Sequence, residues 1–488
     1  MKVLFFALEC KPFSKVGGVG DVALELPKAL QDEGVDMEIV TPLYGSINRD
    51  WIEPTPYLTY KIEFKDINGN LKEEDVSLYR STYKDIKVTF IQNSSYFEGN
   101  YGEPYVFSPH TPFYDDFIRF HFFSLAAVKV VELKEPDIVH GNDWGTGFLM
   151  AHLKLINNSS KRVFSIHNNA YQGNMWIPAI RNWSIMDYLE NKTFKNDFMD
   201  PRKNWNSVNP LKLGIMSSDA VNAVSPSYKK EMLLKDKPSS YFYGAGGLEK
   251  SLKSIDKKGR MYGILNGFEY KNNKDYSTVL EEKKACKREL NTFFEKPDNI
   301  LIGFVGRAVE QKFKLLQEEL DNISVLEYIT DNRSINIAIL ATGLPEYEQF
   351  LERFKDMPNV SITLAFDKDM ASKISLGCDI FFMPSLYEPC GITQMESLSN
   401  ATPPLVRYIG GLKDTVIPYK QSGGTGFGFS GNSRNKILQN LLLSVSEAVN
   451  LYYNEPERFD KIRQEAFNQR FLWSDSAKKY IEMYNDLV

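Results

Sequence analysis

The chain has 488 residues, of which 43% are hydrophobic, and its formal net charge is −5. This length predicts two or three soluble globular domains, and the lack of a basic block argues against a nucleic-acid partner. No apolar run is long enough to span a bilayer. Four cysteines without a CxxC pair or zinc spacing argue against a structural metal or a disulfide framework. We therefore expect a cytoplasmic protein.

The chain begins with the pattern of a βαβ unit. A buried-strand run covers residues 3–8, a glycine-bearing loop covers 15–21, and residues 22–30 place apolar side chains on one helical face. Gly34 suits the end of that helix, and the next strand is predicted over 37–41.

A polar, tyrosine-rich stretch follows this unit. It has a turn signal at Asn68-Gly69 between two alternating segments, which predicts an inserted hairpin. Further strands are expected at 138–140, 162–166 and 219–224, and His167 comes directly after the second of these.

The second half of the chain repeats the alternation, and from about residue 435 onward only helices are predicted. Its predicted strands cover residues 299–305, 335–342, 360–366, 379–384 and 404–407. Alternation of this kind predicts two doubly wound α/β domains that join near residues 263–267. Ligands of such sheets bind beyond the carboxyl ends of the strands, so two facing domains would place both sets of strand ends along one cleft.

The first candidate motif is the loop from Lys15 to Asp21, with the sequence KVGGVGD. Its glycines let backbone amides approach an anion at a helix start, and Lys15 adds a cation. The alternative is a tight turn without a ligand.

The second motif runs from Gly306 to Lys312. Arg307 follows a buried strand and Lys312 lies five residues on. This pair suits a diphosphate, because the arginine guanidinium offers a fork of N–H donors and the lysine ammonium a point charge. The alternative is a surface salt-bridge pair.

The third motif runs from Pro384 to Gln394, with the sequence PSLYEPCGITQ. After the strand comes Glu388, and a helix begins at a Pro-Cys-Gly turn whose amides at residues 391–393 can hold phosphate oxygens. An unpaired carboxylate beside such amides is disfavoured. We therefore expect a sugar with developing positive charge next to Glu388, and a helix-start carboxylate is the alternative.

Two histidine clusters, His140 to Trp144 and His167 to Gly173, follow neighbouring predicted strands. Their imidazoles, amides and aromatic rings suit hydrogen bonds to sugar hydroxyls and stacking on a sugar ring. The alternative is that the histidines are structural.

Two last glycine-rich segments cover residues 410–411 and 423–428. Their glycines either let the backbone come close to another group or mark turns only.

In this order the motifs resemble the bacterial glycogen synthase and starch synthase family, over residues 6–429. Further matching strings are Val224-Ser225-Pro226, Gly263-Ile264-Leu265-Asn266-Gly267 and Gly410 to Val416. The resemblance implies an α/β GT-B fold of two doubly wound Rossmann-like domains facing a central cleft. The implied acceptor-side domain covers 1–262, the nucleotide-sugar domain covers 263–471, and a final helix, 472–488, packs back on the first domain.

The implied reaction transfers glucose from ADP-glucose, or from UDP-glucose, to the non-reducing end of an α-1,4-glucan with retention of configuration. Front-face attack is implied, with the departing phosphate oxygen taking the proton of the acceptor. We predict that the reaction needs no metal ion, because no Asp-x-Asp string with a metal role stands at a predicted strand end. We also predict no cofactor and no membrane or nucleic-acid partner, and the sequence leaves the oligomeric state open. The alternatives are another retaining GT-B transferase with a small acceptor and an inactive glucan-binding homologue.

The motifs and the resemblance together nominate site residues. The catalytic candidates are Glu388, Arg307, Lys312 and His167. The donor-binding candidates are Lys15, Gly17, Gly18, Asp21, Asn266, Cys390, Gly391, Ile392, Thr393 and, against the adenine, Phe366. The candidates for acceptor or sugar contacts are Asp143, Tyr171 and Gln172.

The chain departs from the family pattern at several positions, which are Gly145, Phe268-Glu269, Phe313 and Glu396. They leave the phosphate and sugar contacts in place. The donor base, the acceptor chain length and turnover stay open on this account.

Overall fold

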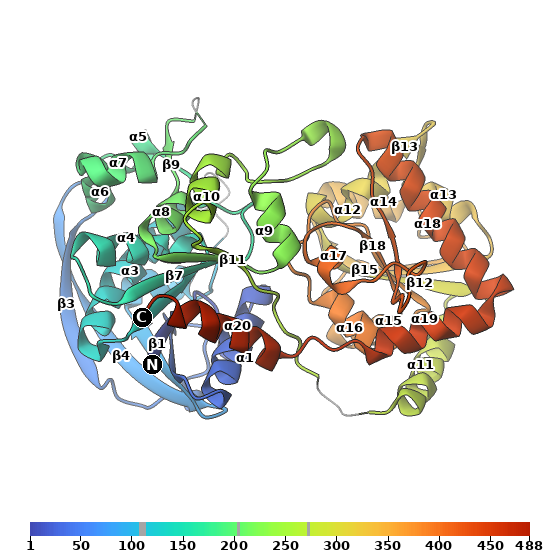
Figure 1. Cartoon of the computed structure of the whole chain (residues 1–488), viewed down its shortest axis with the longest axis horizontal. Helices are drawn as coiled ribbons and strands as arrows, with labels where there is room; N and C mark the ends of the chain where they lie inside the picture. The colour runs from blue at the N-terminus through green and yellow to red at the C-terminus, as the bar shows by residue number, and fades with distance from the viewer. Residues whose placement is uncertain (107–113, 203–204, 271–273) are drawn as a thin grey trace. The chain divides into compact units, whose positions relative to one another are not determined.

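The structure is a computed structural model, shown in Figure 1, that describes residues 1–106, 114–202, 205–270 and 274–488. It forms two compact units, so the expected two-domain α/β architecture is confirmed. The first unit contains residues 1–235, 244–267 and 472–488, and the second contains 236–243 and 268–471.

The first unit is built on a nine-stranded sheet with the order β11-β10-β7-β6-β1-β2-β5-β4-β3. The strands are β1 (Lys2–Phe6), β2 (Asp36–Pro42), β3 (Leu58–Lys65), β4 (Leu71–Tyr83), β5 (Ile86–Gln92), β6 (Ile138–Asn142), β7 (Lys161–Ile166), β10 (Ala220–Ala223) and β11 (Met261–Gly263). Strands β3 and β4 form the expected antiparallel hairpin, whose turn Gly69 has φ +85°. The other seven strands are parallel to their neighbours among themselves.

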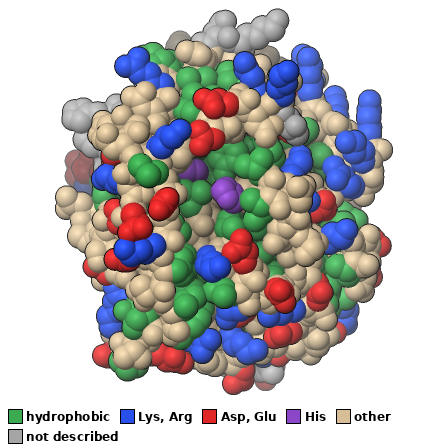
Figure 2. Space-filling view, turned by 90° about the vertical axis from the view of Figure 1, so that its left-hand side faces the viewer, with side chains coloured by type: hydrophobic (Ala, Val, Ile, Leu, Met, Phe, Trp, Pro, Cys, Tyr) green, Lys and Arg blue, Asp and Glu red, His purple; other side chains and the backbone are tan. Residues whose placement is uncertain are grey.

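The larger helices of the first unit are α1 (Gly18–Asp32), α3 (Tyr114–Lys134), α4 (Gly147–Leu155), α7 (Lys192–Phe198), α8 (Pro210–Ser217), α9 (Pro226–Met232), α10 (Glu249–Asp256) and α20 (Trp473–Asn485). The short elements α2 (Ser94–Phe97), α5 (Ile177–Ile180), α6 (Asp187–Glu190), β8 (Met175–Trp176) and β9 (Ser207–Val208) complete it. On the face shown in Figure 2, acidic and basic side chains are intermixed with apolar ones.

The second unit has a six-stranded, fully parallel sheet with the order β16-β15-β12-β17-β18-β19. The strands are β12 (Ile300–Ala308), β15 (Ile335–Gly343), β16 (Val360–Thr363), β17 (Ile380–Met383), β18 (Pro404–Arg407) and β19 (Phe427–Phe429). Strand β19 was not predicted from the sequence, and β16 was predicted to reach Phe366, three residues beyond its end in the structure.

The helices of the second unit are α11 (Tyr276–Asn291), α12 (Glu310–Gln317), α13 (Val325–Asp331), α14 (Pro345–Glu352), α15 (Lys368–Gly377), α16 (Thr393–Ser399), α17 (Gly410–Thr415), α18 (Arg434–Asn454) and α19 (Pro456–Asn468). The small hairpin of β13 (Glu319–Leu320) and β14 (Ile323–Ser324) lies between α12 and α13 in the chain. Along β12, Ile302 and Phe304 join one apolar cluster and Leu301 joins another. Successive side chains of a strand point to opposite faces, so both faces are buried and the strand has a continuous apolar sequence.

Both sheets reverse their strand order beside their first strand. In the second unit the chain moves outward from β12 through β15 to β16, and then returns to the other side of β12 with β17. In the first unit the same reversal lies between β1 and β6. The loops that leave such neighbouring strands go in opposite directions, and the crevice between them is where open α/β sheets bind ligands.

The first unit extends beyond residue 262, where the sequence analysis ends the first domain. Strand β11 pairs with β10 through Gly263, and the amide of Ile264 donates to the carbonyl of Ala223 at 3.0 Å. The segment 236–243 lies with the second unit, because Nη1 of Arg407 donates to the carbonyl of Tyr241 at 2.9 Å. Hydrogen bonds between segments that are distant in the sequence thus decide to which unit residues 263–264 and 236–243 belong.

The C-terminal helix α20 belongs to the first unit and lies beside α1 in Figure 1. Tyr480 and Tyr484 of this helix are fully buried. The Tyr480 hydroxyl accepts from Nδ2 of Asn222 at 2.7 Å, and the Tyr484 hydroxyl lies 2.6 Å from Nδ1 of His140. Among the described helices, none combines the length and the apolar content that a membrane crossing needs.

We predict that Tyr480→Phe lowers the free energy of unfolding of the first unit by about 1–3 kcal/mol, because it leaves the buried Asn222 amide without this acceptor. Tyr79→Phe is the matched control, since the half-buried Tyr79 hydroxyl has no hydrogen bond among the described residues. Urea-unfolding midpoints of the two variants test this, and equal midpoints would show that the hydrogen bond contributes nothing.

Candidate functional site

Three predicted residues lie at or beyond the carboxyl ends of the strands at the reversal of the second unit. Arg307 is the penultimate residue of β12 and its side chain is exposed, with no hydrogen-bond or ion-pair partner among the residues that the structure describes. Lys312 lies in the first turn of α12, and Glu388 lies in the loop after β17 and is 9% exposed. This end of the sheet therefore carries two cations and one carboxylate.

Lys312 and Glu388 form an ion pair through Nζ and Oε2. Ser385 ties the two together, since its Oγ lies 3.3 Å from the Lys312 Nζ and 3.3 Å from the same Glu388 oxygen. The sequence predicted a sugar beside this carboxylate, and in the structure Lys312 and Ser385 supply a positive charge and a hydroxyl there. Lys312 comes from α12, and the order β12-β17 brings the two loops together.

The loop that carries Glu388 is held by glycines. The amide of Gly411 donates to the Glu388 carbonyl at 2.9 Å, and a Cβ at Gly411 would lie 2.1 Å from the Cys390 carbonyl. A Cβ at Gly410 would lie 2.0 Å from the Glu388 carbonyl. Close backbone approach, one of the two interpretations of this glycine pair, is thus correct, and the segment that it approaches is the protein's own loop.

The start of α16 supplies the predicted amides. Gly391 has φ +74°, and a Cβ there would lie 2.2 Å from Oε1 of Gln394, so the turn needs glycine. Residues 391–393 are half-buried, whereas the Cys390 side chain is only 5% exposed. Cys390 is therefore buried inside the turn, and its thiol is not accessible to a donor.

Phe366, the predicted adenine contact, lies in the loop after β16 and is 81% exposed. Its ring centroid lies 5.8 Å from Nζ of Lys368. An aromatic ring this exposed contributes little to the core, so its position leaves a full face for a partner.

In the first unit, the loop from Lys15 to Asp21 already binds a carboxylate of the protein. Glu9 is 1% exposed, and its Oε2 accepts from the amides of Val16 at 2.5 Å and Gly17 at 2.8 Å. Burial raises the pKa of Glu9, and the two amide bonds oppose that rise. The amides of Val16 and Gly17 are therefore already engaged by the carboxylate of Glu9, and an external anion would have to use other groups of this loop.

Lys15 remains available at the rim of this loop. Its side chain is 46% exposed, and Nζ lies 2.6 Å from Oδ2 of Asp21. Gly18 is the first residue of α1 and is exposed. Of the predicted donor contacts in this loop, the lysine side chain and Gly18 are therefore the accessible ones.

His167 follows β7, and its ring is held by Asn142, the last residue of β6. Nδ2 of Asn142 donates to the Phe6 carbonyl at 2.9 Å, so its Oδ1 faces His167, whose Nε2 lies at 2.8 Å. Nε2 must then carry the proton, and Nδ1 is an acceptor. Burial lowers the pKa of His167 to about 4, so the ring is neutral at physiological pH. Sequence reasoning missed the role of Asn142.

Asp143 braces the same loop. Its Oδ1 accepts from the amide of His167 at 2.8 Å, and its own φ is +56°. Burial raises the pKa of Asp143 to about 7, against the lowering effect of amide bonds from His167 and Asn168, and the charge of Glu9 adds to the rise.

His140, by contrast, is structural. It is fully buried, and its ring nitrogens lie 2.6 Å from the Tyr484 hydroxyl and 2.8 Å from Oγ of Ser165. Burial lowers its pKa to about 3. A sugar contact by His140, one of the two interpretations of its cluster, is wrong, because this side chain docks the C-terminal helix.

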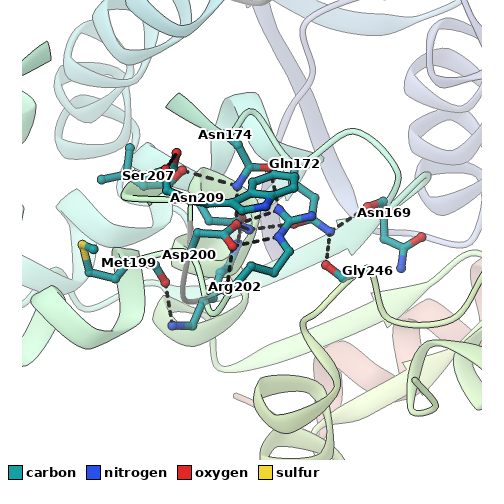
Figure 3. Close-up of polar contacts among 12 residues, drawn as sticks. Asn169, Gln172, Asn174, Met199, Asp200, Arg202, Ser207, Asn209 and Gly246 are labelled. Atoms are coloured by element: carbon teal, nitrogen blue, oxygen red, sulfur yellow. Dashed lines mark hydrogen bonds and ion pairs between the residues drawn. The ribbon is translucent and has the colours of Figure 1, made fainter. Parts of the chain in front are cut away.

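Gln172 lies in a buried polar network of the first unit, shown in Figure 3. Its Nε2 donates to the carbonyls of Asn169 at 3.0 Å and Gly246 at 3.1 Å. Its Oε1 accepts from Nδ2 of Asn209 at 2.6 Å and Nη2 of Arg202 at 3.3 Å. These four bonds use the whole side-chain amide, so Gln172 supports its loop and has no group left for a sugar.

Two further predicted ligand contacts are Tyr171, whose side chain is accessible, and Asn266, which has an unused hydrogen-bond acceptor. Tyr171 is 40% exposed. Asn266 is 4% exposed, and its Oδ1 is buried without a hydrogen-bond partner among the described residues. Most buried side-chain oxygens in proteins do have a hydrogen-bond partner, so a ligand hydroxyl that donates to Oδ1 of Asn266 would fill an unused acceptor.

Comparison with known proteins gives consistent matches along the whole chain. The starch synthase catalytic domain family matches residues 2–254, and the glycosyl transferases group 1 family matches residues 287–464. The chain is 34% identical to the glycogen synthase of Lactococcus lactis subsp. lactis (strain IL1403), over 100% of both proteins. It is also 34% identical to the glycogen synthase of Thermotoga maritima, over 99% of this chain and 98% of that protein.

A solved structure extends this likeness to the fold. The catalytic domain of starch synthase IV from Arabidopsis thaliana, bound to ADP and acarbose, matches with a TM-score of 0.80 and 25% identity. The match covers 100% of this chain and 99% of that one.

The raised pKa of Asp143 predicts a pH dependence of stability. The native pKa is about 7, whereas an unfolded aspartate has a pKa of about 3.9. The native state therefore keeps the proton to a higher pH than the unfolded state does. The contribution of Asp143 to the free energy of unfolding is greatest below about pH 4, and it falls by up to about 4 kcal/mol as the pH rises to 7.

Asp143→Asn removes this titration, keeps an acceptor oxygen and tolerates the positive φ. We expect the variant to gain stability relative to the natural protein as the pH rises from 4 to 7, and the difference to level off above that. Urea midpoints at pH 5, 6, 7 and 8 measure it. A difference that does not change with pH would contradict the protonated state.

Proposed function

The chain belongs to the bacterial glycogen synthase and starch synthase family, and we propose that it uses ADP-glucose as its donor. It is a retaining glycosyltransferase of the glycogen synthase type that transfers glucose to a glucan. The related Arabidopsis starch synthase IV catalytic domain binds ADP, which supports ADP over UDP for this chain. The proposed acceptor is the non-reducing end of an α-1,4-glucan.

The observation that carries the proposal is the group of Arg307, Lys312 and Glu388 at the strand reversal of the second unit. A nucleoside diphosphate needs fixed cations, and its charge grows as the bond to glucose breaks. Cations that are already positioned stabilise that charge without reorganisation. We assign this task to Arg307 and Lys312, with the amides of residues 391–393 as further donors.

Glu388 has a separate proposed task. Its carboxylate is held by Lys312 and Ser385, so its position is fixed before any sugar binds. As the glycosidic bond breaks, positive charge develops at the anomeric carbon, and a fixed carboxylate stabilises it. In the front-face reaction that we propose, the departing phosphate oxygen takes the proton of the attacking hydroxyl, so Glu388 transfers no proton.

In the first unit we assign the sugar contacts to His167 and Asn266. Because Nε2 of His167 faces Asn142, Nδ1 is the nitrogen that can accept a sugar hydroxyl. The unpartnered Oδ1 of Asn266 suits a second hydroxyl. Lys15 is a proposed further cation for the diphosphate, Phe366 a proposed stacking surface for adenine, and Tyr171 a proposed acceptor contact.

The proposed compartment is the cytoplasm. Cys10, Cys286, Cys378 and Cys390 are all free thiols, which is typical of a reducing environment.

A transfer assay tests the donor and the reaction together. Radiolabelled ADP-glucose and UDP-glucose are each supplied with glycogen or with maltose, in buffer containing EDTA. We expect label to enter glycogen from ADP-glucose at the higher rate, and EDTA to leave that rate unchanged because Arg307 and Lys312 supply the positive charge. Preference for UDP-glucose contradicts the donor assignment, and loss of activity in EDTA that Mg²⁺ restores contradicts the metal-free mechanism.

We predict that Arg307→Ala weakens ADP binding at least tenfold, because a charge-assisted hydrogen bond to phosphate is worth about 1.5–3 kcal/mol. The melting temperature stays the same, since the exposed guanidinium has no partner among the described residues. Arg288→Ala removes an equally exposed arginine on α11 and serves as the control. Calorimetric titration with ADP decides, and equal affinities for the two variants would contradict the assignment.

Glu388→Gln separates catalysis from binding. We predict that it lowers the transfer rate at least 10²-fold, or about 3 kcal/mol of barrier. ADP affinity is retained or increased, because Lys312 is no longer neutralised by the carboxylate. The measurements are ADP affinity, melting temperature and glucosyl transfer on the same preparation.

Glu318→Gln is the control for this variant. Glu318 is 6% exposed and pairs with Lys314 at 3.0 Å and with Arg434, so it is as buried as Glu388 and is also held by cations. We expect a loss of stability from the control without a loss of turnover per folded molecule. An active Glu388→Gln enzyme would mean that the catalytic centre lies elsewhere.

A further inference from the structure

A pocket of about 210 Å³ lies at the amino-terminal ends of β7, β10 and β11 in the first unit. His167 follows the opposite, carboxyl end of β7, so the pocket lies across the sheet from the candidate sugar contacts. Residues at or near the ends of α4, α7, α8 and α10 form its other walls. The proposed reaction uses none of its residues.

The pocket is lined by more cations than carboxylates. Its charged residues are Lys154, Arg162, Lys258, Arg260, Asp197 and Asp219. Arg162 pairs with Asp219, with Nη2 and Oδ2 3.0 Å apart, and Lys154 lies 4.0 Å from Asp197. Each carboxylate therefore has a cation of its own.

The remaining two cations lack a counter-charge. Neither Arg260 nor Lys258 makes a side-chain hydrogen bond or ion pair within the described part of the chain. Nε of Arg260 is buried without an acceptor. The pocket thus holds two positive charges that the protein leaves uncompensated.

A second buried polar atom in the same wall is also unsatisfied. Ser217, the last residue of α8, is 2% exposed, and its Oγ has no hydrogen-bond partner among the described residues. Buried polar side-chain atoms nearly always have a partner. Two uncompensated cations, Arg260 and Lys258, together with the orphan atoms of Arg260 and Ser217, call for a ligand that is anionic and rich in acceptor oxygens.

We propose that this pocket binds a small phosphate-bearing anion. A phosphate group has about two negative charges and three or more acceptor oxygens at neutral pH. Those charges match Arg260 and Lys258, and the oxygens can accept from Arg260 and Ser217 at once. With liquid water at about 30 Å³ per molecule, a pocket of about 210 Å³ has room for inorganic phosphate or for a phosphate monoester of a few carbons.

The site is independent of the proposed donor chemistry. Its residues lie in the first unit, whereas Arg307 and Lys312 belong to the second. Phosphate at this pocket should therefore bind whether or not ADP is present.

The test is calorimetric titration of the full chain, saturated with ADP and held at constant ionic strength with chloride. The two titrants are inorganic phosphate and glycerol 3-phosphate. We expect saturable binding of one phosphate group per chain. Tighter binding of glycerol 3-phosphate identifies a phosphate-monoester site, and binding of inorganic phosphate alone identifies a site for the free ion; both results support the proposal.

Variants locate the binding. Arg260→Gln should weaken phosphate binding at least tenfold, and Lys258→Gln gives a second measurement at an exposed position. Lys257→Gln is the matched control, because this exposed neighbour removes the same charge but does not line the pocket. In the absence of phosphate, all three variants should melt at the same temperature as the natural protein.

Three results would overturn the proposal. The first is the absence of saturable binding to the natural protein. The second is an equal loss in Arg260→Gln and Lys257→Gln, which would indicate diffuse charge. The third is loss of phosphate binding in Arg307→Ala, which would place the anion at the donor site instead.

Discussion

The candidate chemistry of the second unit depends on one constraint, the reversal of strand order between β12 and β17. Strands that are neighbours in this sheet but whose connections run in opposite directions leave a crevice beyond their carboxyl ends, and both following loops begin beside it. Arg307 is the penultimate residue of the first of these strands, Lys312 lies in the first turn of the helix after it, and Glu388 lies in the loop after the second. The ion pair of Lys312 and Glu388 exists because the sheet places these two loops side by side.

The loop geometry around Glu388 shows how such a site is held. Gly410 and Gly411 come so close to the backbone of Glu388 and Cys390 that a single added carbon would overlap a carbonyl oxygen. Tight packing of this kind fixes a carboxylate before substrate binds, which is what stabilisation of a developing charge requires. The first unit achieves the same with hydrogen bonds, since Asn142 orients His167 and a saturated network holds Gln172 (Figure 3).

The few buried polar atoms without a partner stand out against this background. Among the described residues of the first unit, the buried side-chain atoms without a partner are Oγ1 of Thr41, Nδ1 of His121, Oγ of Ser184, Oγ of Ser217, Nε of Arg260 and Oδ1 of Asn266. The Asn266 oxygen lies at a residue that the sequence already nominated, so the structure adds a physical reason to that choice. The Ser217 and Arg260 atoms share one pocket at the amino-terminal end of the sheet, a place without any sequence motif.

The sequence by itself determined the family, the two doubly wound units and most of their strands, because these signals are local. A buried strand is a short apolar run, and a glycine-rich turn or a strand-end cation is readable from adjacent residues. Arg307 and Phe366, for example, were nominated as ligand contacts at or just after the ends of predicted strands, and both side chains are exposed in the structure. The tertiary structure alone decided which groups are already engaged.

Glu388 lies 76 residues from its partner Lys312, and His140 lies 344 residues from Tyr484. No local pattern encodes such pairs, because they depend on which strands become neighbours. Glu9, only a few residues before the amides it binds, was missed for a related reason. Whether a loop's amides face outward or onto a carboxylate depends on backbone direction, which residue spacing does not specify.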